Sequence, residues 1–323
     1  MKLKAFIVGL GQIGMGYDFK EDYHVSCLTH LNAILAHDGY ELVGGFDVSL
    51  ERRNMFESKS KVKCFADLFE GLTKTSPDFV IISTPTETHF EILKTILKLK
   101  TVKAILCEKP VSYDDEEATH MVDLCQKNNV KLFVNYQRFY LPSSDVIKKK
   151  LFPSNSEIEF LKGVCWYSKG LIHNGSHFIN LLESWLGNLE SIESIVAHNY
   201  WSEEDTEPDA LFSFKKGNVF FISSRESDFT HYLIELVTSE GKLSYKNGGD
   251  EIYWQSKVSD PIFPGYTILS KNMEPIESNS LKSQYFVLDK ISKFMGNDNS
   301  IAVCEAFSTL NMIRMLRKLK VEK

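Results

Sequence analysis

Cysteine is scarce in this chain, which has six among its 323 residues. They are Cys27, Cys64, Cys107, Cys125, Cys165 and Cys304. No two of them form a C-x-x-C pair, so neither a zinc ribbon, nor a dithiol redox site, nor a disulfide framework is indicated. Scattered free thiols are typical of a reducing compartment, and we therefore expect a cytoplasmic protein.

The chain also lacks a basic excess and any long apolar run. Its 37 basic and 43 acidic residues give a net charge of −6, which argues against a nucleic-acid partner. No stretch of 18 apolar residues occurs, so no membrane partner is expected. The apolar segment at residues 5–10 is short and runs into a glycine-rich turn without an A-x-A cleavage site, unlike a signal peptide.

The first 135 residues alternate between two kinds of pattern. Five apolar runs are typical of buried parallel strands. They are Leu3–Val8, Glu41–Phe46, Asp78–Ser83, Ala104–Cys107 and Lys131–Val134. Between them, apolar residues recur at helical spacing, as in Glu87–Lys98 and Asp114–Asn128. Strand and helix in turn predict a doubly wound α/β domain with a parallel sheet.

The pattern changes after about residue 160, where short aromatic and β-branched runs follow one another. They are Lys162–Tyr167, Leu189–His198, Ala210–Phe214, Asn218–Ser223, Tyr232–Thr238, Lys242–Tyr245 and Glu251–Gln255. Hairpin-like connections at 215–218 and 239–242 predict an open, predominantly antiparallel sheet. Helices from Ser176–Leu186 and from 279–320 are expected to cover one face of it.

The length predicts about two domains. We place a dinucleotide-binding domain at 1–140 and an α+β domain for substrate binding and oligomerisation at 141–323. The last stretch, 300–323, is able to pack back on the first domain. Leu141–Ser156, with two prolines, is expected to form the linker.

A glycine-rich motif, Gly9-Leu10-Gly11-Gln12-Ile13-Gly14, directly follows the first predicted strand. In an alternating chain this placement is typical of a Rossmann dinucleotide site. The glycines allow a tight turn and a close approach of the backbone to a pyrophosphate, which the helix N-terminus then holds. We therefore assign Gly9, Gly11, Gln12, Ile13 and Gly14 to cofactor binding. The alternative is a glycine-rich turn without a ligand.

An acidic residue, Asp47, ends the second strand and can accept hydrogen bonds from ribose hydroxyls, which favours NAD. It lies 33 residues after the last glycine of the motif, where about 20 is usual, so we expect an insertion at Gly16–Cys27 before a helix at 30–37. Arg52 and Arg53 leave NADP possible, since either could reach a 2′-phosphate. Alternatively, Asp47 caps the next helix.

Three motifs together resemble the Gfo/Idh/MocA family, which includes glucose–fructose oxidoreductase and inositol dehydrogenase. They are the opening glycines, Thr84-Pro85-Thr86-Glu87-Thr88-His89 after the third strand, and Glu108-Lys109-Pro110 after the fourth. The resemblance covers most of the first 140 residues. It implies an NAD(P)-dependent oxidoreductase that acts on a sugar or cyclitol hydroxyl. It also implies a second domain that often forms the oligomer interface, hence a homodimer or homotetramer through the C-terminal sheet.

The resemblance assigns roles to single residues. Lys109 is the family lysine that sits between nicotinamide and substrate, while Thr84, Pro85, His89 and Glu108 join the cofactor site. Lys109 also lies at the carboxyl end of a parallel strand, where ligands bind in open α/β sheets. A positively charged nicotinamide lowers the pKa of a facing lysine, which suits proton exchange with a hydroxyl. The alternative is a solvated surface lysine.

The resemblance extends to 173–186. Many relatives carry G-x-L-x-D-x-G-x-H-x-x-D, which this chain matches at Gly170, Gly175 and His177 and departs from at His173 and Asn180. His177 is therefore the implied catalytic histidine, without its usual carboxylate neighbour. It falls in the first turn of a predicted helix, whose positive end keeps the ring neutral. The alternative is a capping or packing role.

A third segment, Asn135–Pro142, resembles the family stretch that enters the second domain and lines the substrate pocket. Its tyrosine and arginine could bind hydroxyls, a carboxylate or a phosphate, or could simply pack between domains. The substrate-binding candidates are Tyr136, Arg138, His173, Asn174 and His177. His173 and His177 are four residues apart, but no H-E-x-x-H glutamate or nearby cysteine accompanies them, so no metal is assigned.

The leading functional hypothesis is hydride transfer between NAD, with NADP possible, and a carbinol or ketone of a sugar, cyclitol or nucleotide sugar. Lys109 would polarise the oxygen and His177 would exchange the proton. Two alternatives remain open. One is a non-catalytic, NAD-responsive sugar-sensing regulator, against which the intact Glu108-Lys109-Pro110 argues. The other is a reductase of C=N or C=C bonds, similar to biliverdin reductase.

Overall fold

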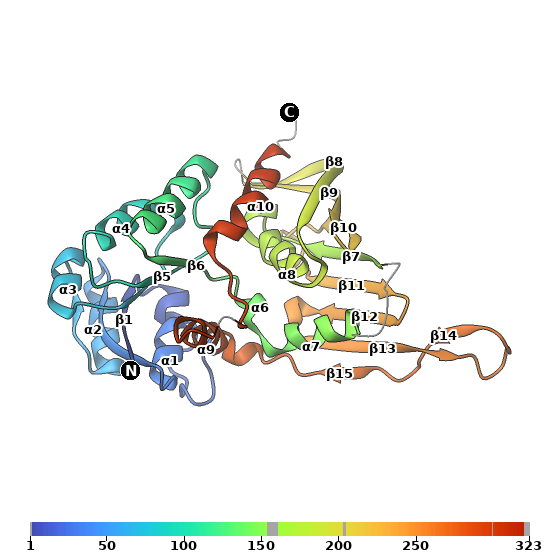
Figure 1. Cartoon of the computed structure of the whole chain (residues 1–323), viewed down its shortest axis with the longest axis horizontal. Coiled ribbons are helices and arrows are strands. Elements are labelled where there is room, and N and C mark those ends of the chain that lie inside the picture. Colours follow the sequence, from blue (N-terminus) through green and yellow to red (C-terminus); the bar gives the residue numbers. More distant parts are fainter. Residues whose placement is uncertain (1, 154–160, 203–204, 299, 320–323) are drawn as a thin grey trace. The chain divides into compact units, whose positions relative to one another are not determined.

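The structure is a computed structural model that describes residues 2–153, 161–202, 205–298 and 300–319. The chain divides into two compact units, whose elements Figure 1 labels. The first comprises Met1–Tyr140 and Leu281–Leu310, and the second comprises Leu141–Ser280 and Asn311–Lys323. The segment that returns to the first unit thus starts at 281 and ends at 310, whereas the sequence predicts 300–323 for it.

The first unit is built on a six-stranded parallel sheet in the order β3-β2-β1-β4-β5-β6. The strands are β1 (Leu3–Val8), β2 (Tyr40–Phe46), β3 (Cys64–Phe65), β4 (Phe79–Ile82), β5 (Ala104–Cys107) and β6 (Lys131–Val134). Every residue of β4 and β5 is buried, because helices cover both faces of such a sheet. The predicted Rossmann-type sheet is confirmed. Only β3, two residues long, gives no apolar run to recognise.

Seven described helices belong to this unit, and four of them begin at a short polar side chain that accepts a backbone N–H group. They are α1 (His30–Ala36), α2 (Leu50–Ser60), α3 (Leu68–Thr75), α4 (His89–Ile96), α5 (Asp115–Lys127), α6 (Gln137–Tyr140) and α9 (Ser283–Met295). Thr29, Ser49, Asp67 and Asp114 accept hydrogen bonds at the starts of α1, α2, α3 and α5. Helix α9 packs against α1 and α6, so this part of 279–320 does not cover the second sheet as predicted.

The predicted insertion separates a five-residue π-helical turn, η1 (Gln12–Gly16), from α1. The buried carboxylate of Asp18 closes it, because this group accepts hydrogen bonds from Leu28 N at 2.6 Å and from Thr29 Oγ1 at 2.6 Å. Lys59 Nζ on α2 donates to Phe19 O at 2.6 Å. The segment is therefore fastened at both ends, and it fixes where α1 begins.

The second unit contains a nine-stranded sheet in the order β14-β13-β12-β11-β7-β10-β9-β8, with β15 paired to β13. Its strands are β7 (Leu161–Tyr167), β8 (Leu189–Ser202), β9 (Asp205–Phe214), β10 (Gly217–Ser223), β11 (Leu233–Thr238), β12 (Gly241–Lys246), β13 (Glu251–Ser259), β14 (Thr267–Leu269) and β15 (Glu274–Ile276). The predicted antiparallel character is confirmed except at one pair, since β7 and β10 run parallel.

Helices α7 (Pro142–Leu151) and α8 (Ser176–Leu186) pack on each other in this unit. Helix α10 (Ala306–Lys318) is the last helix of the described residues. The predicted linker at 141–156 is wrong for most of its length, because Pro142 occupies the first turn of α7 and Ile147 and Leu151 are buried. Residues 154–156 lie outside the described part. Among the described residues, no helix combines the length and hydropathy needed to cross a bilayer.

Candidate cofactor and substrate sites

The glycines after β1 have different structural roles. Gly9 has φ +92°, and a Cβ there would lie 2.7 Å from the Ser83 carbonyl oxygen, so only glycine suits this turn. A Cβ on Gly14 would collide with the carbonyl oxygen of Gly9. A Cβ on Gly11, by contrast, would meet no atom within 4 Å. Gly9 and Gly14 therefore allow close packing, while Gly11 borders open space.

That open space is a cavity of about 670 Å³, within the size range of small-molecule sites. Its lining residues are Gly9, Gly11, Gln12, Ile13, Tyr17, Phe46, Asp47, Val48, Arg52, Ser83, Thr84, Pro85, Thr88 and Ile92. Seven of these are predicted cofactor residues, brought together because parallel strands end at one edge of the sheet. Tyr17 comes from the inserted segment, and no motif in the sequence marks it.

Asp47 lies in this cavity with its side chain 4% exposed. Its two oxygens accept hydrogen bonds from Leu10 N and Ser49 N, both at 2.8 Å. Each carboxylate oxygen has a further lone pair, so Asp47 can still accept ribose hydroxyls. The alternative that Asp47 caps the next helix is wrong, because Ser49 is the N-cap of α2.

The two arginines that leave NADP possible differ in position. Arg53 Nη1 donates to the carbonyl oxygens of Asp47 and Val48, both at 2.9 Å, which directs its guanidinium at the backbone. Arg52 lines the cavity, with its side chain half exposed and Nη1 3.6 Å from Asp47 Oδ2. Of these two, Arg52 is the residue placed to meet a 2′-phosphate.

A dinucleotide suits the groups that line this cavity. The first amides of a helical turn lack intrahelical acceptors, and η1 presents them next to the open space at Gly11. Asp47 supplies an acceptor for ribose at the end of the neighbouring strand. Thr84 and Pro85 form the wall that follows β4.

His89, a predicted cofactor residue, does not line the cavity. It is fully buried, with Nε2 2.9 Å from the carbonyl oxygen of Thr84 and Nδ1 3.1 Å from that of Val111. The thiol of Cys107 lies 3.3 Å from Nδ1. The structure thus places His89 behind Thr84, where it supports the cavity wall.

Glu108 and Lys109 follow β5, and the Lys109–Pro110 peptide bond is cis. The Glu108 carboxylate points into the protein rather than into the cavity, with Oε1 2.8 Å from His30 Nε2 and 2.6 Å from Asn135 Nδ2. Burial alone raises the pKa of Glu108, but hydrogen bonds from His30 and Asn135 and the charge of Lys109 together lower it. Sequence reasoning did not find His30 or Asn135 because each is distant from Glu108 along the chain.

Two substrate-binding candidates, Tyr136 and Arg138, lie between β6 and α7, and they differ in solvent exposure. Tyr136 is buried, 1% exposed, and directly follows Asn135 at the end of β6. Arg138 lies on the short helix α6 and is partly exposed. Tyr136 therefore belongs to the packed interior of the first unit, and Arg138 is the one of the two that has solvent access.

In the second unit, a five-residue turn, η3 (Leu171–Gly175), leads into α8 and contains His173 and Asn174. His177 lies in the first turn of α8 and is 6% exposed. The His173 ring stacks on Trp201, with centroids 4.4 Å apart. The Asn174 amide donates to Ser168 O at 3.2 Å and to the Tyr232 hydroxyl.

Two buried carboxylates from β9 hold this turn. Asp205 accepts Ile172 N at 2.9 Å and His173 N at 2.7 Å, and Glu207 accepts Gly170 N at 2.9 Å. Burial raises the pKa of Asp205, although the backbone N–H groups oppose the shift. A Cβ on Gly170, which has φ +78°, would collide with Asp205. This chain has His173 where many relatives carry an aspartate. The carboxylate that binds the backbone N–H of residue 173 comes instead from Asp205 on β9.

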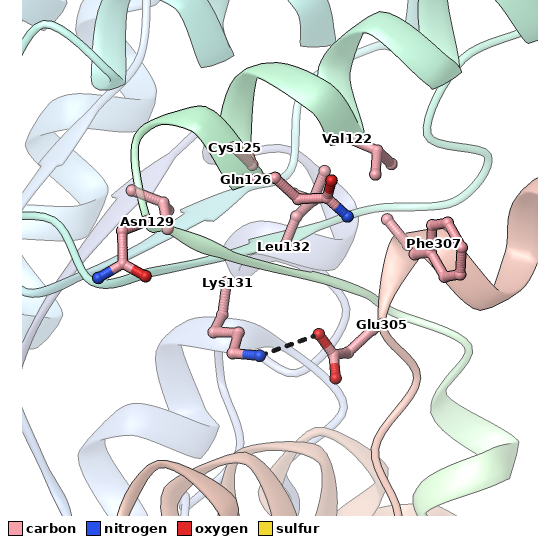
Figure 2. Close-up of a pocket in the computed structure, with 10 residues that line it drawn as sticks. Val122, Cys125, Gln126, Asn129, Lys131, Leu132, Glu305 and Phe307 are labelled. Carbon is pink, nitrogen blue, oxygen red and sulfur yellow. Dashed lines mark hydrogen bonds and ion pairs between the residues drawn. The ribbon is translucent and has the colours of Figure 1, made fainter.

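In the described part of the chain, no three His, Cys, Asp or Glu side chains are grouped to hold a metal ion. All six cysteines are buried free thiols. A second pocket in the first unit, about 210 Å³, is bordered by Phe307 and by the Lys131–Glu305 ion pair of 3.5 Å (Figure 2). No predicted site residue lines it.

Comparison with known families gives the class of fold and cofactor. Residues 3–136 match the model of the Gfo/Idh/MocA family, which is described as "Oxidoreductase family, NAD-binding Rossmann fold". A curated relative, myo-inositol 2-dehydrogenase of Thermotoga maritima, is 28% identical over 137 residues, which are 42% of this chain and 36% of that protein. The chain thus matches only about a third of that relative's length.

Two solved structures share the fold over nearly the whole chain. The super-repressor mutant of Gal80p from Saccharomyces cerevisiae has a TM-score of 0.74 at 13% identity, covering 99% of this chain and 95% of its own. The WlbA dehydrogenase from Bordetella pertussis, solved with NADH and UDP-GlcNAcA, has a TM-score of 0.69 at 16% identity, covering 98% and 95%. At these identities the likeness shows the fold alone.

Proposed function

We propose that this protein is an NAD(P)-dependent oxidoreductase that acts on the CH–OH group of a sugar, cyclitol or nucleotide sugar. The observation that carries the proposal is the cavity beside Gly11 and Asp47, built from three strand ends, in a unit whose next strand ends in Glu108-Lys109-Pro110. The family of residues 3–136 is NAD-binding, and the curated relative is an inositol dehydrogenase.

The protein's residues have distinct tasks in this reaction. Backbone amides of η1 bind the pyrophosphate, and Asp47 binds the adenosine ribose. When bound, the nicotinamide accepts or supplies the hydride at C4. Lys109 donates a hydrogen bond to the substrate oxygen and polarises it. In the direction of alcohol oxidation, the carbinol carbon loses a hydride, and His177 takes the proton that the hydroxyl releases.

NAD is the cofactor that the residues favour. Asp47 is almost fully buried and directed at the site, where a carboxylate would repel a 2′-phosphate. Arg52 at 3.6 Å reduces that repulsion and leaves NADP as the weaker ligand. Titration with NADH and with NADPH, followed by the fluorescence of the reduced nicotinamide, measures the preference directly.

A homodimer or homotetramer is part of the proposal. Large apolar side chains on three strands of the second sheet are exposed, namely Ile195 on β8, Phe220 on β10 and Val237 on β11. Contiguous exposed apolar surface marks contact sites between subunits, and we propose that these side chains contribute to such a surface. Light scattering after size exclusion gives the mass in solution, and a monomer at all concentrations contradicts this assignment.

A second candidate function is an NAD-responsive regulator without turnover. His173 and Asn180, which replace the two carboxylates common in the family, favour it. The deciding experiment screens sugars, cyclitols and nucleotide sugars against NAD and NADH by absorbance of the reduced cofactor. Turnover that Lys109→Ala abolishes supports the oxidoreductase. Cofactor binding without turnover of any candidate, coupled to a change in a protein partner's affinity, supports the regulator.

A further inference from the structure

The inserted segment between η1 and α1 contributes one aromatic side chain to the wall of the proposed cofactor cavity. That side chain is Tyr17, which lines the cavity and is 64% exposed. The contacts proposed above for pyrophosphate and ribose do not include it. A ligand that filled the cavity would cover part of this ring, and the burial of apolar surface would favour binding.

The backbone fixes the position of Tyr17 relative to the glycine motif. The Tyr17 N–H donates to the carbonyl oxygen of Gln12 at 3.0 Å, which is the i to i+5 hydrogen bond of a π-helical turn. Tyr17 therefore follows Gln12 by about one turn of η1, and both residues line the cavity. A Cβ on Gly16 would lie 2.5 Å from Gln12 Oε1, so glycine at this position leaves room for the Gln12 side chain.

The residues that follow Tyr17 are fastened to two helices. Lys59 Nζ, near the end of α2, donates to the carbonyl oxygens of Phe19 at 2.6 Å and Glu21 at 3.2 Å. Asn32 Nδ2, on α1, donates to the carbonyl oxygen of Asp18 at 3.0 Å, and the Asn32 side chain is buried. These bonds order the segment directly after Tyr17, so the ring is held beside the cavity before any ligand arrives.

The attachment to α2 indicates which half of a dinucleotide Tyr17 would meet. Helix α2 follows β2 and Asp47, the residue assigned to the adenosine ribose. Asp47, Val48 and Arg52, from the end of β2 and the first turn of α2, line the same cavity as Tyr17. Val48 is 82% exposed, so a second apolar side chain is open at this side of the cavity.

From these positions we infer that Tyr17 binds the adenosine half of the dinucleotide with its ring packed against the adenine, and that Lys59 is a positioning residue that acts through Tyr17. The inference rests on the proposed function, because it takes this cavity as the NAD(P) site. Every nucleobase has a π-face, so an aromatic side chain gains free energy by stacking on it. A ring that is ordered in advance loses less conformational entropy when the cofactor binds.

The test measures binding, without substrate or turnover. Isothermal titration calorimetry on the full chain gives the affinities for NADH and for ADP-ribose, which has the adenosine and the pyrophosphate but no nicotinamide. Tyr17→Ala should weaken both ligands by the same factor, about 5- to 150-fold, as expected for the loss of one base–aromatic stack. Tyr17→Phe should bind both nearly as tightly as the wild type does, because the ring remains.

A tyrosine of the same segment is the matched control. Tyr23 borders a different cavity, together with Phe19 and Lys59, and does not line the one that contains Asp47. Tyr23→Ala should leave the affinities for NADH and ADP-ribose unchanged. Thermal melting verifies that each variant is folded.

A double-mutant cycle tests the positioning role of Lys59. Lys59→Met should weaken ADP-ribose binding several-fold in the wild-type background and leave it unchanged in the Tyr17→Ala background, because its effect passes through Tyr17. Lys61→Met is the control, since Lys61 Nζ donates to the carbonyl oxygen of Ser58 on its own helix at 2.7 Å. Equal losses from Lys59→Met in both backgrounds refute the positioning role.

A folded Tyr17→Ala protein with wild-type affinity for ADP-ribose overturns the inference. A Tyr17→Phe protein that binds as weakly as Tyr17→Ala also overturns it, because the ring is then not the binding group. The outcome is separable from the proposed function. Binding that depends on Tyr17 without turnover of any substrate refutes the oxidoreductase alone, whereas turnover with an NADH affinity independent of Tyr17 refutes the inference alone.

Discussion

The proposed cofactor cavity of the first unit and the His173–His177 region of the second are built in different ways. The cavity collects residues that directly follow β1, β2 and β4, and its glycines act through backbone geometry. The turn before α8 is instead held by Asp205 and Glu207, which lie more than 30 residues later in the chain. A short motif therefore describes the first region well and the second only in part, because long-range side chains complete the second.

The largest expected effect compares one catalytic candidate from each region. Lys109→Ala and His177→Ala should each reduce kcat by about 10²- to 10⁴-fold, since the first removes the group that polarises the substrate oxygen and the second removes the group that takes the proton. Cofactor affinity should stay near the wild-type value in His177→Ala. Lys103→Ala, at the opposite end of β5 in an exposed ion pair with Asp78, is the matched control. Steady-state kinetics of the three variants show whether both regions take part in one reaction. Full activity in His177→Ala would show that the His173–His177 region does not take part in it.

Two glycine substitutions separate binding from folding. Gly170→Ala should destabilise the protein by about 2 kcal/mol or more, because its φ is +78° and its Cβ would meet the Asp205 carboxylate. Gly11→Ala should leave the melting temperature nearly unchanged, since its Cβ meets no atom within 4 Å. It should instead weaken NADH binding by obstructing the pyrophosphate. Thermal melts and fluorescence titrations are measured on both variants, and a Gly11→Ala protein with unaltered NADH affinity speaks against the cavity as the cofactor site.

A smaller effect concerns the cofactor preference. Asp47→Ala should reduce NAD affinity about 10-fold, as expected for the loss of hydrogen bonds to a charged acceptor, and should change NADP affinity less. Arg52→Ala should weaken the binding of NADP more than that of NAD. Arg53→Lys tests the role of the contacts that Arg53 makes with the carbonyl oxygens of Asp47 and Val48. If Asp47→Ala binds NAD as tightly as the wild type does, the ribose assignment is refuted.

The smallest effect is a pH dependence in the second region. Because burial raises the pKa of Asp205, the folded protein binds this proton more tightly than the unfolded chain does. The resulting contribution to stability is complete below the unfolded pKa and is lost as the pH rises through the folded pKa. Asp205→Asn should remove this loss of stability with rising pH. Urea unfolding across mildly acidic pH checks the difference, and parallel curves for the two proteins contradict it.

Much of the first unit could be predicted from the sequence. Apolar runs located five of its six strands, and the glycine motif with Asp47 located the cavity. The motifs predict His89 and Glu108 as cofactor residues, yet neither lines the cavity, because a motif gives the position of a residue and not the direction of its side chain. Tyr17 was missed since no periodic pattern marks the inserted segment.

The sequence by itself determined the Rossmann sheet, the antiparallel second sheet and the resemblance of residues 3–136 to an NAD-binding oxidoreductase family, because burial patterns and glycine spacing are local properties. Only the tertiary structure decided that α9 joins the first unit, that His30 reaches Glu108, and that Asp205 holds the backbone at 173. These contacts join residues 32 to more than 200 positions apart along the chain. Such pairings depend on how the whole chain packs, which no local pattern encodes.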